Sequence, residues 1–141
     1  MLYAYPARIK TIPGETVLQF RDLPEGIAGG ATREAAIEAA EGVLQAALWF
    51  RLKEERKIPS PSPPKRGDVL VPVRAATAAK VAFAAAFHAS GLSRLELARR
   101  LKLDDKEVRR MLDPEHPTKI ERLDEAIRAL GQRLVLMVEG A

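Results

Sequence analysis

The sequence predicts an α+β domain followed by an all-α domain, and three observations support this order. Short alternating segments separated by turns with Pro and Gly occupy residues 3–30, which is typical of paired strands. A stretch of helical periodicity follows over residues 32–57. From the alanine-rich residues 75–90 onward, the pattern stays helical up to about residue 130. We place the boundary at about Val73/Arg74, which gives domains of residues 1–73 and 74–141.

Four strands are expected in the first domain. The first, Tyr3–Lys10, carries Tyr and aliphatic residues on one face, and Pro6 within it suggests a sheet edge or a bulge. It is expected to form a hairpin with the second strand across a Pro–Gly turn. The other three expected strands are Thr16–Phe20, Ile27–Gly30 and Asp68–Val73.

One long helix and a stiff connector complete the first domain. Thr32 is a natural N-cap, and Ile58–Pro59 ends the helix because the residue before proline disfavours helical backbone. The expected buried stripe on this helix is Ile37, Ala40, Leu44 and Leu48. The connector "PSPSPPKRG" is too rich in proline for a helix or a central strand, so it is expected to be extended.

Two short helices in the second domain predict a nucleic-acid interface. Ser93 and Asp104 are natural N-caps, and about three residues separate the helices, which must therefore cross sharply. This is the helix-turn-helix arrangement, whose second helix enters the major groove. With Val108 and Met111 turned inward, the residues expected on the DNA side are Asp105, Lys106, Arg109 and Arg110. Lysine and arginine there can contact phosphates or the acceptor edge of guanine, and an aspartate can accept from the amino group of cytosine. Phosphate contacts are expected from Ser93, Arg94 and Lys119.

The charge distribution favours an anionic partner for the second domain. Residues 1–73 carry ten Lys/Arg and nine Asp/Glu, hence +1, whereas residues 74–141 carry thirteen and ten, hence +3. Residues 94–110 alone hold seven basic and four acidic side chains. A solvated basic face on a plain helical unit is the alternative. Lys102 departs from the helix-turn-helix pattern, because glycine is common at this left-handed position and another residue costs about 1 kcal/mol there.

The C-terminal segment "RLVLMVE" is expected to form a strand that pairs with a second copy of the chain. An isolated edge strand seeks a partner, and DNA-reading helices of this type usually act in pairs. We expect Leu134 and Leu136 to pair across a two-fold axis in a homodimer or higher homo-oligomer. The alternative is that this strand packs on its own domain.

No catalytic residue, metal site or cofactor is predicted. The chain has no cysteine, and its first expected strand has no Asp or Glu, although a two-metal nuclease needs clustered acids. Asp22 lies next to proline in a turn, where bonding to local backbone is expected. Trp49 is expected in a core or an interface. Three further acids, read as a solvated helix face, are Glu34, Glu38 and Glu41.

A cytoplasmic location is expected for this chain. No apolar run approaches the roughly 20 residues needed to span a membrane. The N-terminus lacks the basic start and apolar core of a signal peptide.

Four motifs occur in a fixed order: "YPA", "FRDLPEG", "GGATREAAIEAAEGVL" and "IPSPS". Together they resemble the HicB antitoxin family over essentially residues 1–139, and the second domain resembles the repressor-type helix-turn-helix of some members. The resemblance implies a degenerate ribonuclease-H-like first domain that binds a HicA-like, mRNA-cleaving toxin, and repression of its own operon through operator DNA. Ala35 departs from the family pattern, in which Glu is frequent at that position. The alternative is a stand-alone transcription regulator whose first domain binds a small ligand or only dimerises.

Overall fold

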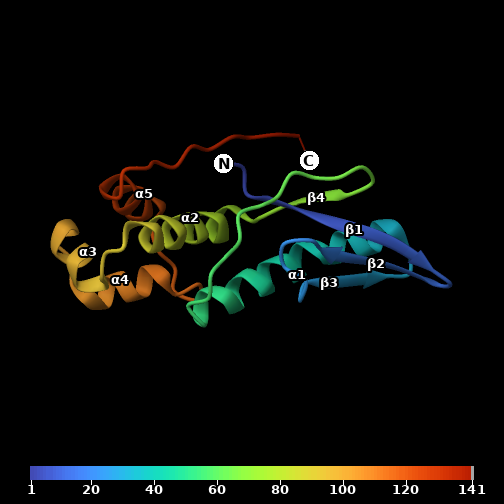
Figure 1. Cartoon of the computed structure of the whole chain (residues 1–141), viewed down its shortest axis with the longest axis horizontal. Helices are drawn as coiled ribbons and strands as arrows, with labels where there is room; N and C mark the ends of the chain where they lie inside the picture. Colours follow the sequence, from blue (N-terminus) through green and yellow to red (C-terminus); the bar gives the residue numbers. More distant parts are fainter. Residues whose placement is uncertain (141) are drawn as a thin grey trace. The chain divides into compact units, whose positions relative to one another are not determined.

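The computed structural model describes residues 1–140 and divides the chain into two compact units. Unit 1 comprises Met1–Ala78, and unit 2 begins at Ala79. The division falls inside helix α2 (Ala75–Ser90), a few residues after the boundary expected at Val73/Arg74. Over the described residues the chain forms four strands and five helices, in the order shown in Figure 1.

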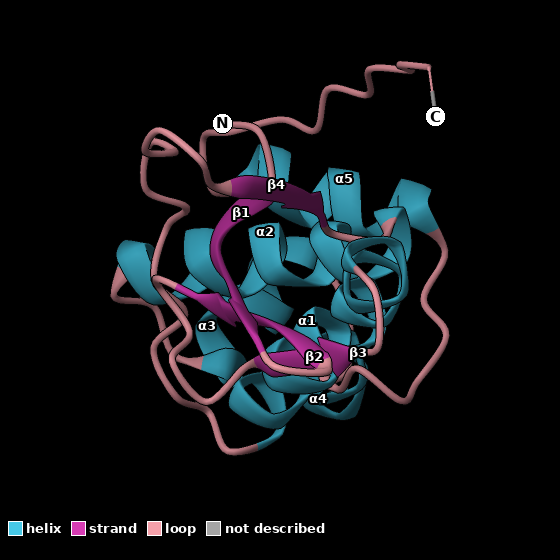
Figure 2. Cartoon of the chain, turned by 90° about the vertical axis from the view of Figure 1, so that its right-hand side faces the viewer, coloured by secondary structure: helices cyan, strands magenta, loops and turns pink. Residues whose placement is uncertain are grey.

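Unit 1 contains a four-stranded antiparallel sheet in the order β3-β2-β1-β4. Its strands are β1 (Ala4–Ile12), β2 (Glu15–Phe20), β3 (Ile27–Gly30) and β4 (Val69–Pro72). The first part of β1 pairs with β4, and the second part pairs with β2 from Ala7 onward. Figure 2, in which the strands are magenta, shows β1 passing from β4 to β2. The four strands expected from the sequence are all present.

Pro6 was expected at a sheet edge or a bulge, and it lies in the part of the central strand β1 that pairs with β4 alone. The ladder between β1 and β2 begins only at Ala7. On the other side, the Val73 N–H donates to the Tyr3 carbonyl over 2.9 Å, and bonded pairs alternate along an antiparallel ladder. The pair Pro6–Leu70 is therefore a non-bonded pair, and the Pro6 nitrogen faces the β2 side. There the Arg21 N–H donates to the Pro6 carbonyl over 3.1 Å, and the reciprocal bond, which proline cannot make, is missing at the end of the β1–β2 ladder.

Helix α1 (Arg33–Lys53) covers one face of this sheet. The Thr32 cap is confirmed, since its Oγ1 accepts the Ala35 N–H over 3.1 Å. Ile37 is only half-buried, and the buried side chains of α1 are instead Ala36, Ala40, Leu44, Ala47, Leu48 and Leu52. The sheet meets them with Tyr5, Ala7, Leu18, Phe20, Ala28 and Val71, all buried. The core of unit 1 therefore lies between α1 and one face of the sheet.

Unit 2 is helical and encloses its own apolar core. Its other helices are α3 (Arg94–Leu101), α4 (Asp105–Leu112) and α5 (Ile120–Ala129). Helix α2 contributes its two phenylalanines, Phe83 and Phe87, which stack with ring centroids 6.2 Å apart. The remaining core residues come from all four helices: Ala79, Leu97, Ala98, Val108, Met111, Leu123, Ala126 and Ile127.

The expected C-terminal strand does not form within this chain. Residues 132–140 have no regular secondary structure, and unit 2 holds no other strand among its described residues. Because a strand exists only through hydrogen bonds to a neighbouring strand, the apolar pattern by itself cannot produce one here. Leu134 packs against the core of unit 2, and its N–H donates to Asp124 Oδ1 over 3.1 Å. Leu136 is 74% exposed.

Candidate nucleic-acid interface

The two expected short helices of unit 2 are α3 and α4, joined by residues 102–104. Each N-cap is formed as the sequence indicates: Ser93 Oγ accepts the Glu96 N–H, and Asp104 Oδ1 accepts the Lys106 N–H, both over 3.1 Å. Lys102 adopts the left-handed conformation, with φ 56° and ψ 43°. The lysine therefore takes the backbone conformation for which glycine is favoured, and the connection keeps its three-residue length.

The outer side of α4 carries the cations expected to meet DNA. Val108 and Met111 are buried in the core, as expected, while Lys106, Arg109 and Arg110 are exposed. Arg109 lies 3.6 Å from Asp105, its neighbour one turn earlier on the same helix. The Arg109 side chain is largely solvated and Asp105 is partly exposed, so this pair is weak and its geometry is easily changed.

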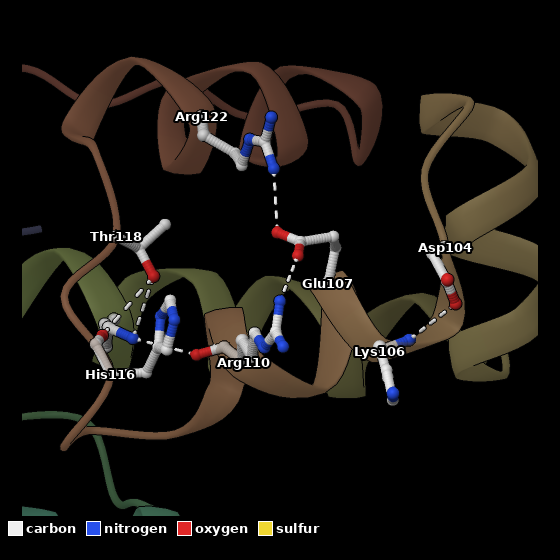
Figure 3. A network of polar contacts seen from close by, with 8 residues as sticks. Asp104, Lys106, Glu107, Arg110, His116, Thr118 and Arg122 are labelled. Carbon is white, nitrogen blue, oxygen red and sulfur yellow. Dashed lines mark hydrogen bonds and ion pairs between the residues drawn. The ribbon is translucent and has the colours of Figure 1, made fainter.

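Glu107 joins α4 to α5 through two arginines, a contact that the sequence analysis missed. Its Oε1 accepts a hydrogen bond from Arg110 Nη1 over 2.6 Å, and its Oε2 accepts one from Arg122 Nη1 over 2.9 Å. Figure 3 shows the carboxylate between the two guanidinium groups. The spacing of Glu107 and Arg110 along one helix was visible in the sequence, but the position of Arg122 depends on how α5 packs.

Lys80 ties α2 to the C-terminal end of α4. Its buried ammonium donates to the carbonyls of Arg110 (3.0 Å) and Asp113 (2.5 Å) and to Thr118 Oγ1 (3.0 Å). Those carbonyls lie where a helix leaves its last acceptors without intrahelical partners, so a cation there satisfies them. Burial lowers the pKa of Lys80 to about 8, and the Asp113 carboxylate acts in the opposite direction.

The three residues expected at phosphates lie at the beginnings of two helices. Ser93 and Arg94 begin α3, and Lys119 is the N-cap residue of α5, with no side-chain capping bond. Helix N-termini present unpaired N–H groups and positive dipole ends, which suit phosphate. The Ser93 hydroxyl accepts a bond as a cap and keeps its own hydrogen for another acceptor.

In unit 1 the proline-rich connector and Asp68, which follows it, are bound to β1 and to the turn after β2 at three points. Asp22 accepts the Ser62 N–H over 2.9 Å and the Ser62 hydroxyl over 2.8 Å, so the expectation that Asp22 bonds local backbone is wrong. The Tyr5 hydroxyl donates to the Pro59 carbonyl over 2.7 Å, and burial raises the pKa of Tyr5. These contacts join the motifs "YPA", "FRDLPEG" and "IPSPS" in one place.

The third point is an ion pair between Arg21 and Asp68, just before β4. Arg21 Nε and Nη2 donate to the two carboxylate oxygens over 2.7 and 2.8 Å. The hydrogen bond from Arg21 holds the pKa of Asp68 below its usual value. This bidentate geometry fixes where the connector ends and the last strand begins.

The outer side of α1 carries the acids read from the sequence as a solvated face. Glu34 and Glu38 are exposed, and Glu41 lies 3.7 Å from Arg74. Trp49, expected in a core or an interface, is half-buried, and its Nε1 donates to Thr77 Oγ1 over 3.0 Å. It therefore contacts the first turn of α2 inside unit 1.

Residues 1–140 contain no group of three or more His, Asp or Glu placed to hold a metal ion. None of the helices in this range combines the length and apolar character needed to cross a membrane.

Comparison with known proteins identifies the class of this chain. Residues 4–82 match a family model described as the HicB-like antitoxin of bacterial toxin-antitoxin systems. The matched range covers all but the first three residues of unit 1 and continues to residue 82, within α2. This class consists of regulatory antitoxins and not of enzymes, and an antitoxin implies a toxin as its partner.

Curated relatives extend the match over nearly the whole chain. An antitoxin HicB 1 from Photorhabdus laumondii is 36% identical over 136 residues, which covers 96% of this chain and 86% of the relative. An antitoxin HicB from Pseudomonas fluorescens is 34% identical, with 100% and 97% covered, and one from Escherichia coli is 35% identical, with 95% and 98% covered. The chain belongs to the HicB-like antitoxin family.

Proposed function

We propose that unit 1 binds and neutralises a HicA-like, mRNA-cleaving toxin, and that unit 2 represses the chain's own operon by binding operator DNA in the cytoplasm. The helix pair α3–α4 is the observation that supports the proposed DNA binding. It has two capped helices, a three-residue connection and an exposed basic side on the second helix. In a helix-turn-helix the second helix enters the major groove with this side toward the bases.

The DNA half of the proposal is tested with variants of the exposed cations. Arg109→Ala should cost about 1–3 kcal/mol of binding energy if Arg109 contacts a guanine. Lys119→Ala should weaken all sequences similarly and lower the salt slope by about one, as expected for a phosphate contact. The contrary result is equal binding, at several salt concentrations, by the wild type and a Lys106/Arg109/Arg110 triple-alanine variant.

The toxin half rests on charge and on family membership. A protein that cleaves RNA must present a basic surface to its substrate, and Glu34 and Glu38 form an exposed acidic face on α1. Further along the chain, Glu54 and Glu55 add negative charge at the end of α1. Complementary charge speeds association, whereas buried apolar contacts set the lifetime of the complex. The exposed apolar residues Ile27 and Leu70 belong to the edge strands β3 and β4 and can supply such contacts.

Two full-length variants separate the two halves of this proposal. Each is expressed in cells together with the toxin candidate encoded by the adjacent gene. A Glu34→Lys/Glu38→Lys variant should rescue growth less well than the wild type and bind DNA normally. The Lys106/Arg109/Arg110 triple-alanine variant should show the reverse. If the wild type neither rescues growth nor co-purifies with the product of the adjacent gene, the stand-alone regulator becomes the better reading.

We also propose that the C-terminal segment pairs with a second copy of the chain. Val135, Leu136, Met137 and Val138 are consecutive apolar residues between 67% and 97% exposed, and an exposed apolar run favours a partner. Light scattering on a chain that ends at Gly131 tests this idea, because an unchanged oligomer size rules the segment out.

We further propose that unit 1 has a degenerate ribonuclease-H-like fold. Its support is an antiparallel meander of β1, β2 and β3, followed by one long helix across its face and by β4.

A further inference from the structure

We propose that Glu107 is a positioning residue that presents Arg110 to a guanine in the operator, so that Arg110 determines sequence specificity. This inference rests on the proposed DNA-binding function of unit 2. Glu107 itself is an anion on a helix that is expected to approach phosphates, and a negative charge there opposes binding. The structure gives it a role that offsets this cost.

The geometry around Arg110 supports the role. Arg110 donates to Glu107 through Nη1 alone. The Nε–Nη2 edge of its guanidinium therefore has no partner among residues 1–140. That edge is the two-donor fork that Arg21 uses toward Asp68 in unit 1. In the major groove the same fork matches the N7 and O6 acceptors of guanine. The contact with Glu107 thus restrains the side chain and leaves its recognition edge open.

Arg122 helps to fix the Glu107 carboxylate that contacts Arg110. It approaches from α5 and binds the second carboxylate oxygen over 2.9 Å, so the carboxylate is held from two helices (Figure 3). Glu107 is also the least exposed of the three side chains, at 30%. A side chain held in this way orders Arg110 before DNA binds, and the entropy cost of fixing a long side chain is then reduced in the complex.

Arg109 provides the contrast on the same helix. Its carboxylate neighbour, Asp105, lies 3.6 Å away, and the Arg109 side chain is 61% exposed. No second helix holds that pair among the residues described. Arg109 is therefore expected to contribute to binding with less demand on its exact orientation, whereas the contribution of Arg110 depends on Glu107.

Glu107→Gln tests the inference, because charge and positioning predict opposite signs. Full-length wild type is first used to select a preferred duplex from a random-sequence DNA pool. Binding is then measured to that duplex and to a scrambled duplex of equal composition. Removing a negative charge alone should tighten both complexes. If Glu107 positions Arg110, affinity for the selected duplex falls roughly tenfold while affinity for the scrambled duplex is unchanged or rises.

Four further variants make the result specific. Arg122→Ala should lower discrimination in the same direction as Glu107→Gln. In an Arg110→Ala background, Glu107→Gln should have no further effect on discrimination, because the residue that it positions is gone. Glu121→Gln removes an exposed acid from the first turn of α5 and controls for charge alone. Thermal unfolding of each variant checks that unit 2 stays folded.

The possible outcomes distinguish the positioning role of Glu107 from the DNA-binding function of unit 2. Suppose that the wild type binds selectively and that Glu107→Gln tightens binding to both duplexes equally. This result overturns the positioning role of Glu107 and leaves the DNA-binding function of unit 2 standing. The same holds if Glu107→Gln lowers discrimination equally in the Arg110→Ala background. A wild type that selects no sequence at all overturns the DNA-binding function, and the inference about Glu107 with it.

Discussion

The stability of unit 2 should rise with pH above about 8 because of the buried Lys80. In the folded chain, burial lowers the pKa of Lys80 to about 8, compared with 10.5 for an unperturbed lysine. Between these two values the folded state has released the proton, whereas the unfolded state still binds it. The unfolded state then binds more protons, so the free energy of unfolding increases with pH.

The size of this effect follows from the two pKa values. At about 1.4 kcal/mol per pH unit, their separation corresponds to a total gain of roughly 3 kcal/mol, of which about 2 kcal/mol falls between pH 7 and 9.5. The measurement should stop at pH 9.5. Burial raises the pKa of Tyr5 above its ordinary value of 10, so ionisation of the unfolded chain lowers stability beyond that pH.

The assay is urea unfolding followed by circular dichroism at 222 nm, on the full-length wild type and on Lys80→Met. Methionine keeps much of the side-chain length and removes the titrating group. The difference between the two unfolding free energies should grow by about 2 kcal/mol from pH 7 to 9.5, which is roughly 1–2 M in urea midpoint at an m-value of 1–2 kcal/mol per M. Parallel pH profiles for the two proteins would refute the reasoning, because every other titrating group is common to both.

Three further predictions concern local geometry. Lys102→Gly should raise the melting temperature and stabilise the chain by about 0.5–1 kcal/mol, because glycine adopts the left-handed backbone without the cost that lysine bears; a lower melting temperature contradicts this. Ser62→Ala should cost about 1–2 kcal/mol in urea unfolding followed by Trp49 fluorescence, since it removes the hydroxyl bonds to Asp22; an unchanged midpoint would show that the connector is held without them. Gly30→Ala should lower the free energy of unfolding by roughly 1–3 kcal/mol, because a Cβ there would lie 2.6 Å from the Ala36 nitrogen. Gly42→Ala should raise it by about 0.5–1 kcal/mol, because its Cβ would meet nothing within 4 Å and alanine favours a helix. Equal effects of the two substitutions would refute the packing argument.

Local features of the fold were predictable because they depend on neighbouring residues. Thr32, Ser93 and Asp104 cap their helices as expected, since a cap needs only its own side chain and an N–H two or three residues later. The apolar spacing also predicted that Val108 and Met111 face the core. The neighbours of Pro6 in the sheet were not predictable in this way. Whether a strand is central or at an edge depends on β4, which lies more than 60 residues further along the chain.

The candidate DNA side was predictable in part. The sequence places Lys106, Arg109 and Arg110 on one side of α4, because helical periodicity alone decides this. It does not show that Arg122 holds Glu107, the partner of Arg110, since that contact joins residues 15 positions apart on different helices. The C-terminal segment shows the same limit, because the apolar pattern indicates a strand and only a partner can supply its hydrogen bonds.

The sequence by itself determined the order of the four strands of unit 1 and of the five helices, the caps at Thr32, Ser93 and Asp104, and the order of motifs that marks this chain as a HicB-like antitoxin. The tertiary structure decided which polar groups meet: Asp22 with Ser62 across 40 positions, and Lys80 with Asp113 across 33. A lysine within an alanine-rich helix carries no local sign that it is buried, and an aspartate in a turn carries no sign of a distant serine. Propensity and periodicity act over a few residues, whereas burial and polar pairing depend on which segments the folded chain brings together.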